Sequence, residues 1–284
     1  MKPNTAKRLL LFFTAIPILI IMVWFDPTPQ LFVMNIFAIC AGIGASMETG
    51  KLFGMRIHRW RTRFGAAILG AVPAFLGFLV ILLGWDIMVF YAGIMITLTV
   101  VLTYVLSVFP EEDKKVSFYA KAGVALTLTI YPGAFIGHFI LFTLLDHSKL
   151  IILLFFLTIF LNDSLAYVGG KLFGKYSNHP FPLSPKKTTI GLIFGLVTSV
   201  VFMGIGSVIF PQLFPLGPLS AMLLGLVTGA LGVAGDLLES GFKRSAGVKD
   251  SGNLIPGRGG IMDSLDSAIF AAPIFFFAFL LFQS

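Results

Sequence analysis

The amino-acid sequence predicts an all-α integral membrane protein that crosses the bilayer about nine times. The first observation is composition: 57% of the 284 residues are hydrophobic and only 12% are charged, whereas a soluble domain carries about 25% charged residues. The second is length, because the apolar residues form runs long enough to span a bilayer as helices. The third is charge distribution, because nearly all cationic side chains fall on one side of these runs.

Nine apolar runs define the expected helices. A helix needs roughly 17–25 residues to cross a bilayer, and an open strand would leave backbone groups unpaired in lipid. The first run follows a basic start, but no small-residue cleavage pattern comes after it, so we expect a retained helix rather than a signal peptide. The expected helices lie at 9–25, 31–47, 64–84, 86–109, 119–145, 150–168, 190–210, 217–237 and 262–282.

The positions of the charges predict the orientation of the chain. Nine helices place the N-terminus and the segments 48–63, 110–118, 169–189 and 238–261 on one side of the membrane. With Lys121 at its edge, that side holds 19 of the 20 Lys and Arg residues. The positive-inside rule assigns it to the cytoplasm. The expected location is therefore the cytoplasmic (inner) cell membrane, with the N-terminus and the polar loops in the cytoplasm.

Polar chemistry is concentrated in the second half of the chain. We divide the sequence into an N-terminal transmembrane region of about five helices, 1–148, and a C-terminal transmembrane region with two cytoplasmic loops, 149–284. Ionisable groups inside membrane spans are costly and indicate functional sites. Five acidic residues of the second region are expected at a similar depth near the cytoplasmic side: Asp163, Asp236, Glu239, Asp263 and Asp266.

Two pairs of these acids predict a metal site. Asp236 and Glu239 are three positions apart, as are Asp263 and Asp266, so each pair shares a helical face. Mg²⁺ is usually held by one or two carboxylates together with substrate phosphates. We predict Asp236 and Asp263 as metal ligands, because neither has a cation one turn away on its own helix. For Glu239 we favour neutralisation by Lys243, four residues later.

The loop between the pairs, "KDSGNLIPGRGG" (249–260), predicts an anion-binding segment. Gly257, Gly259 and Gly260 allow the backbone to approach a ligand closely. Alone, such a loop is more simply a turn, but acids and cations surround it. The combination is typical of a site for a metal-chelated anion, either a nucleoside triphosphate or a lipid phosphate. The flanking cations are Lys243, Arg244, Lys249 and Arg258.

The other cytoplasmic loop ends in "SPKKTT" (184–189), with Lys186 and Lys187 just before the seventh expected helix. Lysines at a helix start oppose the helix dipole, so capping does not explain them. The positive-inside effect and phosphate capture explain them equally well. Phosphate capture would be assisted by the hydroxyl groups of Ser184, Thr188 and Thr189.

Other polar residues admit simpler explanations. Asp163 is either a hydrogen-bonded contact between helices or a further ligand of a metal or a ribose. Cys40 is expected to be a small buried hydrophobe. The basic run 51–63 is typical of a segment that contacts lipid headgroups, and nucleic acid is not an expected partner because no soluble domain presents a binding surface. Glu48, at the inner end of the second helix, receives no role from the sequence.

These motifs resemble the signature of the phosphatidate cytidylyltransferases (CDP-diacylglycerol synthases), roughly S-x-x-K-R-x(4)-K-D-x-G-x-x-x-P-G-H-G-G-x-x-D-R-x-D. The similarity covers about residues 160–270 and includes "ND-x-x-AY-x-x-G" (162–169) and "SPKKT" (184–188). The first 150 residues agree only in being apolar and in having an acid, Glu48, near the end of the second helix. The matching positions of the main signature are Ser240, Lys243, Arg244, Lys249, Asp250, Gly252, Pro256, Gly257, Gly259, Gly260, Asp263 and Asp266.

The resemblance implies the reaction of CTP with membrane phosphatidate to give CDP-diacylglycerol and pyrophosphate. It implies Mg²⁺, with room for a second cation such as K⁺, and it suggests a homodimer in the lipid bilayer. The catalytic residues would be Asp236, Asp263, Lys187 and Arg244, with Asp236 and Asp263 holding the metal. Substrate and phosphate binding would involve Asp163, Ser184, Lys186, Lys243, Lys249, Asp250, Gly257, Arg258, Gly259, Gly260 and Asp266.

The sequence departs from the family pattern at three places. The histidine before the paired glycines is Arg258, the arginine of D-R-x-D is Ser264, and Trp-Glu-Gly is replaced at 189–191 by Thr-Ile-Gly. Arg258 would then replace the missing arginine, or the chain is a diverged member with another lipid phosphate as acceptor or an inactive relative. A CTP-dependent polyprenol or lipid kinase is the nearest alternative, and an ion-coupled transporter is a remote one.

Overall fold

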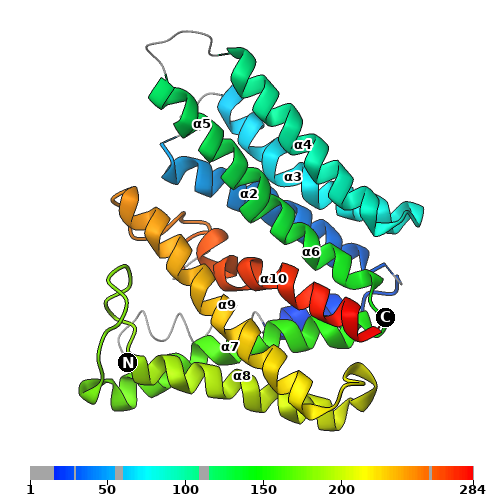
Figure 1. The fold of residues 1–284 in the computed structure, drawn as a ribbon, viewed down its shortest axis with the longest axis vertical. Helices are drawn as coiled ribbons and strands as arrows, with labels where there is room; N and C mark the ends of the chain where they lie inside the picture. Colours follow the sequence, from blue (N-terminus) through cyan, green and yellow to red (C-terminus); the bar gives the residue numbers. More distant parts are fainter. Residues whose placement is uncertain (1–15, 29, 55–59, 109–114, 256–257, 284) are drawn as a thin grey trace. The chain divides into compact units, whose positions relative to one another are not determined.

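The computed structural model describes residues 16–28, 30–54, 60–108, 115–255 and 258–283, and helices make up most of these residues (Figure 1). Within these ranges, seven helical segments are long and apolar enough to cross a membrane. The expected all-α polytopic fold is therefore confirmed. The main helices are α2 (Phe32–Leu52), α3 (Trp60–Leu83), α4 (Ile87–Val108), α5 (Lys115–Leu128), α6 (Phe135–Leu141), α7 (Ser148–Phe173), α8 (Thr189–Ile209), α9 (Pro218–Ser245) and α10 (Met262–Gln283).

The expected helices and the observed ones differ mainly at their ends. Helix α9 continues about two turns past the expected end at residue 237, which places Glu239, Lys243 and Arg244 inside it. The fifth expected helix is divided, because a π-helical turn at Thr129–Ala134 separates α5 from α6. Pro132 lies in that turn and has no N–H to donate to an α-helical bond. In the first expected helix, residues 16–24 are helical, and the total of nine spans stays a prediction.

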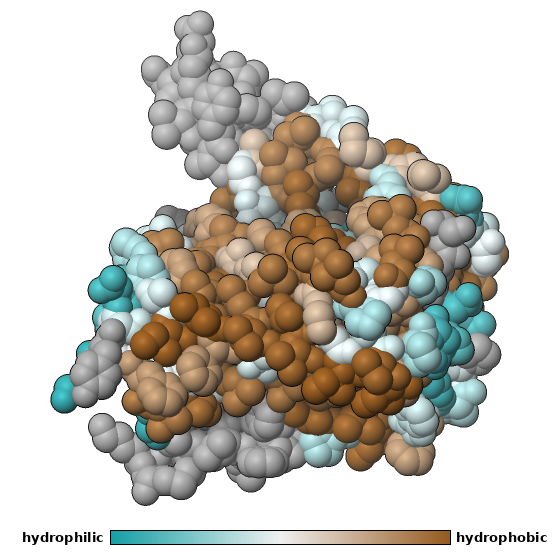
Figure 2. Space-filling model, turned by 60° about the horizontal axis from the view of Figure 1, so that its bottom comes forward, coloured by the Kyte–Doolittle hydropathy of each residue, from teal (hydrophilic) through white to brown (hydrophobic). Residues whose placement is uncertain are grey.

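Apolar side chains cover much of the surface that Figure 2 shows. Helix α8 illustrates the pattern, because every fourth residue or so along one of its faces is a half-exposed aliphatic residue. In water this surface would be unfavourable, whereas in lipid it costs nothing. The stripe therefore marks a membrane-facing side of α8. Its members are Ile193, Val197, Val201, Ile205 and Val208.

The prediction that Cys40 is buried is wrong. Cys40 is exposed on α2, on the same side as the exposed Ile36 and Phe37. The small residues Ala41 and Ala45 occupy the buried side of the helix instead. In a membrane protein an apolar side chain gains little from leaving lipid, so hydrophobicity alone does not predict which side faces the protein.

The chain groups into two compact units. One contains residues 1–25, 145–244 and 265–284, and the other contains residues 26–144 and 245–264. The glycine-rich loop thus groups with the N-terminal helices, and α10 contributes its first residues to one unit and the remainder to the other. The division of the sequence into two regions at residue 148 stays a prediction.

In the unit that contains α2 to α6, helix α2 packs against α3 and α6. Glycines allow close approach of α2 and α3, since a Cβ added to Gly42 would lie 2.9 Å from the carbonyl oxygen of Gly70. One turn later the Ser46 hydroxyl donates to the Ala66 carbonyl oxygen at 2.7 Å. This packing buries the last turns of α2, where Glu48 and Thr49 lie.

In the unit that contains α7 to α10, helix α9 approaches its neighbours through glycines. A Cβ on Gly235 would lie 2.5 Å from the carbonyl oxygen of Asp266 on α10. Close approach of backbones is the usual way in which membrane helices gain packing energy. At another level the rings of Phe155 (α7) and Phe275 (α10) lie 4.8 Å apart, centre to centre. The consequence for the site is that residues near Gly235 and Asp266 are brought together.

Candidate active site

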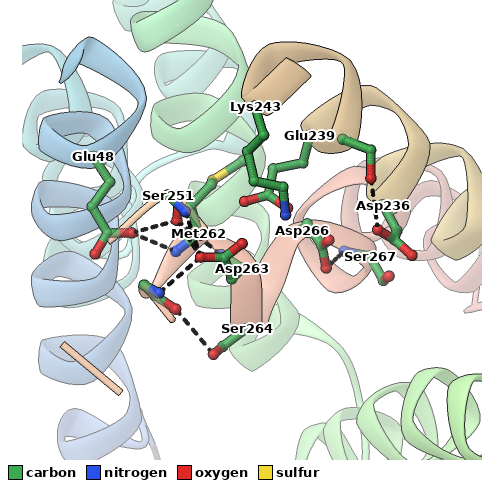
Figure 3. A network of polar contacts seen from close by, with 12 residues as sticks. Glu48, Asp236, Glu239, Lys243, Ser251, Met262, Asp263, Ser264, Asp266 and Ser267 are labelled. Atoms are coloured by element: carbon green, nitrogen blue, oxygen red, sulfur yellow. Dashed lines mark hydrogen bonds and ion pairs between the residues drawn. The ribbon is translucent and has the colours of Figure 1, made fainter. Parts of the chain in front are cut away.

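An acidic cluster lies where α9 and α10 meet. Asp236 and Glu239 of α9 and Asp266 of α10 offer carboxylate oxygens that all lie within 4.8 Å of one another (Figure 3). Glu239 and Asp266 are buried, whereas Asp236 is partly exposed. The contact between Gly235 and the backbone of Asp266 explains the proximity, because a side chain at 235 would separate the helices. The arrangement suits a hard divalent cation, and the predicted ligand Asp236 is part of it.

Two lysines balance the cluster. Lys243 Nζ lies 2.5 Å from Glu239 Oε2, one turn along the same helix, as the sequence predicted. Lys187 Nζ lies 2.6 Å from Asp236 Oδ2. This second pair could not be predicted from helical spacing, because Lys187 comes from the loop before α8 and not from the helix of Asp236. Asp163 of α7 is also close enough for its charge to act on Asp266.

The loop before α8 presents its two lysines differently. Ser184, Pro185, Lys186 and Lys187 form a turn that the Lys187 N–H closes on the Ser184 carbonyl oxygen at 3.0 Å, with proline at the second position that favours such turns. Lys186 is exposed and Lys187 is half-buried. Thr188 Oγ1 accepts from the Gly191 N–H at 3.1 Å and caps α8. The Thr188 hydroxyl therefore has a structural partner.

Glu48 lies at the centre of a second polar network, in the other compact unit (Figure 3). Its Oε1 accepts from the Ile261 N–H at 3.1 Å. Its Oε2 accepts from the Met262 N–H at 2.9 Å and from the Ser251 hydroxyl at 3.1 Å. One signal for this role is visible in the sequence, an acid that stands alone in an apolar helix, but the partners are not.

Asp263 belongs to the same network. Its Oδ2 accepts from the Ser251 N–H at 2.7 Å, the Ser251 hydroxyl at 2.8 Å and the Gly260 N–H at 2.8 Å. An acid that accepts from the N–H three residues earlier resembles half of a capping box at a helix start. Asp263 therefore organises the loop and the first turn of α10. Asp236 and Asp263 fall in different compact units, and their joint role as metal ligands stays a prediction.

The glycines of the loop make room for these carboxylates. A Cβ on Gly252 or on Gly260 would overlap the Glu48 carboxylate, and at Gly260 it would also overlap the Ser251 hydroxyl. At Gly259 the φ angle is +114°, and a Cβ would lie 2.5 Å from Asp263 Oδ2. The sequence predicted that these glycines let the backbone approach a bound ligand. In the structure they let the backbone approach the carboxylates of Glu48 and Asp263. Gly257 lies outside the described residues.

The remaining predicted site residues lie towards the surface. Ser264, which stands where the family has arginine, is half-buried and donates its hydroxyl to the Gly260 carbonyl oxygen at 3.1 Å. Four further predicted site residues are exposed: Arg244, Lys249, Asp250 and Arg258.

Comparison with known proteins assigns the family. A sequence model described as "Cytidylyltransferase family" matches residues 6–282, almost the whole chain. The chain belongs to the cytidylyltransferase family. It is therefore a nucleotidyltransferase, and the resemblance inferred from the motifs is confirmed.

Individual relatives differ in how much they share with the chain. The phosphatidate cytidylyltransferase of Staphylococcus saprophyticus is 33% identical over 208 residues, 73% of this chain and 78% of that protein. The one of Staphylococcus aureus is 29% identical over 239 residues, 84% of this chain and 88% of that protein. The uncharacterized protein YnbB of Escherichia coli is 45% identical over 116 residues, 41% of this chain and 38% of that protein. The bacterial relatives and the apolar helices agree with a multi-pass membrane protein.

Proposed function

We propose that the protein is a phosphatidate cytidylyltransferase, which converts CTP and phosphatidate to CDP-diacylglycerol and pyrophosphate. One observation carries the proposal: in a membrane protein of this family, an acidic cluster suited to a divalent cation lies beside lysines that can bind phosphate. The similarity to the Staphylococcus enzymes supports phosphatidate as the acceptor.

The proposed reaction places few demands on proton transfer. An oxygen of the phosphatidate phosphate attacks the α-phosphorus of CTP, a new P–O bond forms, and the bond to the β-phosphate breaks with release of pyrophosphate. A phosphate monoester is largely ionised near neutral pH, since its second pKa is about 6, so no general base is required. Positioning of the two substrates and neutralisation of their charge should supply most of the rate enhancement.

The acidic cluster fits a Mg²⁺ ion by the chemistry of its donors. Asp236, Glu239 and Asp266 provide only carboxylate oxygens, the ligands that Mg²⁺ prefers. A bound divalent cation would neutralise phosphate oxygens of CTP. Following the family resemblance, we propose Asp263 as a further ligand, with K⁺ as a candidate for a second cation.

Basic residues complete the proposal. Lys187 is held by Asp236 in the structure, and we propose that it exchanges this partner for a phosphate oxygen when CTP binds. Lys186, Lys243 and Arg244 are proposed to contact other phosphate oxygens. Phosphatidate would reach the site from the bilayer and CTP from the cytoplasm. We further propose that the protein lies in the inner cell membrane, with its N-terminus and both loops cytoplasmic, and forms a homodimer.

The test uses purified protein in lipid nanodiscs and CTP labelled on either the α- or the γ-phosphate. The acceptors are phosphatidate, a polyprenyl phosphate, diacylglycerol and a polyprenol. We expect α-label, but no γ-label, in a lipid product formed from phosphatidate, and loss of that product in Asp236→Asn. Asp86→Asn is the matched control, because Asp86 caps the start of α4, a role that asparagine can keep.

Each other outcome contradicts a specific part of the proposal. Transfer of γ-label to an alcohol would identify a kinase. Transfer of α-label only to polyprenyl phosphate would keep the reaction type but replace the acceptor. Absence of label in every lipid, from protein that is folded and binds CTP, would support an inactive relative.

A further inference from the structure

We propose that Glu48 is a positioning residue for nucleotidyl transfer. From α2 it fixes the loop segment around Ser251 and the first turn of α10, and thereby sets the position of Asp263. The inference rests on the proposed function in one respect, which is that Asp263 serves as a cation ligand. It assigns a role in the reaction to a residue of the N-terminal half, which lies outside the main signature at 240–266.

The hydrogen bonds of Glu48 hold its carboxylate against the start of α10 and the loop before it. Two backbone N–H groups donate to it, and the Ser251 hydroxyl lies within hydrogen-bond distance of Oε2. Glu48 is 7% exposed, and a buried carboxylate is costly unless such bonds compensate. Met262 is the first residue of α10 and Ile261 directly precedes it, so Glu48 binds the positive end of that helix. A helix start bound from another helix is held in place as well as capped.

Ser251 links Glu48 to Asp263. The Ser251 hydroxyl lies 3.1 Å from Glu48 Oε2 and 2.8 Å from Asp263 Oδ2. It has a single proton, so it donates to one carboxylate at a time or shares the proton between them. It also accepts from the Asp263 N–H at 3.3 Å. A displacement of Glu48 therefore reaches both the backbone and the side chain of Asp263.

Two glycines support the same role independently of the hydrogen bonds. Gly252 and Gly260 face the Glu48 carboxylate so closely that a Cβ at either position would overlap it. No positive φ angle explains glycine at these two positions, because neither occurs among the left-handed glycines of the described residues. The carboxylate itself is the physical reason for glycine there. The loop thus surrounds Glu48 on two sides.

The same geometry argues against direct contact of Glu48 with substrate. Both of its oxygens are used by the loop, and little of the side chain is exposed. Outer-shell partners of metal ligands change metal affinity or activity about 10–100-fold when they are replaced. We expect an effect of that size from Glu48, transmitted through Asp263.

The experiment compares Glu48→Gln with Thr49→Val. Thr49 is the next residue of α2 and is fully buried, and its hydroxyl has no hydrogen-bond partner among the described residues, so its replacement controls for a change at the end of α2. Three properties are measured: hydrogen exchange of the peptide that contains residues 258–263, Mn²⁺ affinity by electron paramagnetic resonance, and steady-state kinetics.

For Glu48→Gln we expect a folded protein with faster exchange at Ile261 and Met262. Mn²⁺ affinity should fall about tenfold and kcat should fall about 10–100-fold, while the KM for phosphatidate changes less than twofold. Thr49→Val should match the wild type in all three measurements. A wild-type exchange pattern together with wild-type Mn²⁺ affinity in Glu48→Gln would overturn the proposal.

A second variant covers the case in which Glu48→Gln does not fold. Ser251→Ala removes only the hydroxyl that links the two carboxylates, and we expect faster exchange of the same peptide and weaker Mn²⁺ binding. Unchanged exchange and binding would reject the link. Exchange and Mn²⁺ binding need no turnover, so they judge Glu48 even when wild-type protein fails to convert CTP, which would contradict the proposed function alone.

Discussion

Single residues of the acidic cluster have different partners, and this difference separates their roles. Glu239 is fully buried and paired with Lys243 on its own helix, so it balances charge inside the protein. Asp236 is partly exposed and paired with Lys187 from a loop. An ion pair of this kind contributes only about 0–1 kcal/mol. Asp236 is therefore the acid of the cluster that can exchange its partner most easily.

Replacing Lys187 should affect the cation and the nucleotide in opposite directions. Lys187→Ala removes the lysine that competes for Asp236, so Mn²⁺ affinity without nucleotide should rise about two- to fivefold. The KM for CTP should increase, because a phosphate contact is lost. Titration with Mn²⁺ and initial rates check the two effects. For the Mn²⁺ affinity, Lys186→Ala is the matched control, since Lys186 is exposed; equal Mn²⁺ affinity in both variants would argue against the competition.

Restoring the family arginine should be tolerated. Ser264 is half-buried and its hydroxyl makes a single bond to the carbonyl oxygen four residues earlier, a bond that contributes little to helix stability. We expect Ser264→Arg to keep or raise the rate of transfer from CTP. Rates of the single variant and of Ser264→Arg combined with Arg258→His measure this. Total loss in the single variant, with recovery in the double variant, would instead show that the two residues work as a rearranged pair.

At the level of elements, the position of α9 against α10 depends on Gly235. The acids of the cluster come from these two helices, and Gly235 lets α9 approach the backbone of Asp266. In lipid the hydrophobic effect contributes little to the association of the two helices, so close packing of their side chains and backbones must hold them together. A small change at Gly235 should therefore reach both stability and the site.

Gly235→Ala should lower the melting temperature and weaken Mn²⁺ binding. The new Cβ would lie 2.5 Å from a backbone oxygen, and overpacking typically costs about 1–3 kcal/mol. Thermal melting in detergent and Mn²⁺ titration are the measurements. Gly123→Ala on α5 is the control, because nothing lies within 4 Å of a Cβ there. This variant should not lower the melting temperature, since alanine is more stable than glycine inside a helix. Similar melting of both variants would contradict the role of Gly235.

For the whole molecule, the apolar surface requires a membrane but does not orient the chain. The exposed aliphatic stripe of α8 could face lipid whichever end of the helix lies in the cytoplasm. Orientation rests on the distribution of Lys and Arg in the sequence, because the positive-inside rule concerns loops rather than helices. The two loops proposed to bind CTP must be cytoplasmic if the nucleotide comes from that side.

Cysteine labelling in intact cells tests the orientation. Cys40→Ala removes the single cysteine of the chain, and Lys249→Cys or Asp146→Cys is then introduced. We expect a membrane-impermeant maleimide to label Asp146→Cys in intact cells, and Lys249→Cys only after permeabilisation, because these positions belong to opposite predicted sides. The reverse pattern would place the loops outside and would contradict access of cytoplasmic CTP.

The sequence by itself determined the all-α membrane fold, the family and the segments in which the ionisable residues are concentrated. These properties follow from local information: apolar runs of sufficient length, charges in short loops and motifs of fixed spacing. The ion pair of Lys243 with Glu239 was also predictable, since both lie on one helix. The exposure of Cys40 was not, because lipid gives apolar side chains no reason to prefer the interior.

Only the tertiary structure decided which groups meet across long stretches of chain. It grouped Asp266 with Asp236 and Glu239 and paired Asp236 with Lys187. It also brought Glu48 to the start of α10, more than 200 positions later in the sequence. The physical reason is that a carboxylate binds whichever donor or cation the packing of helices brings near it. No periodicity along the chain records that packing.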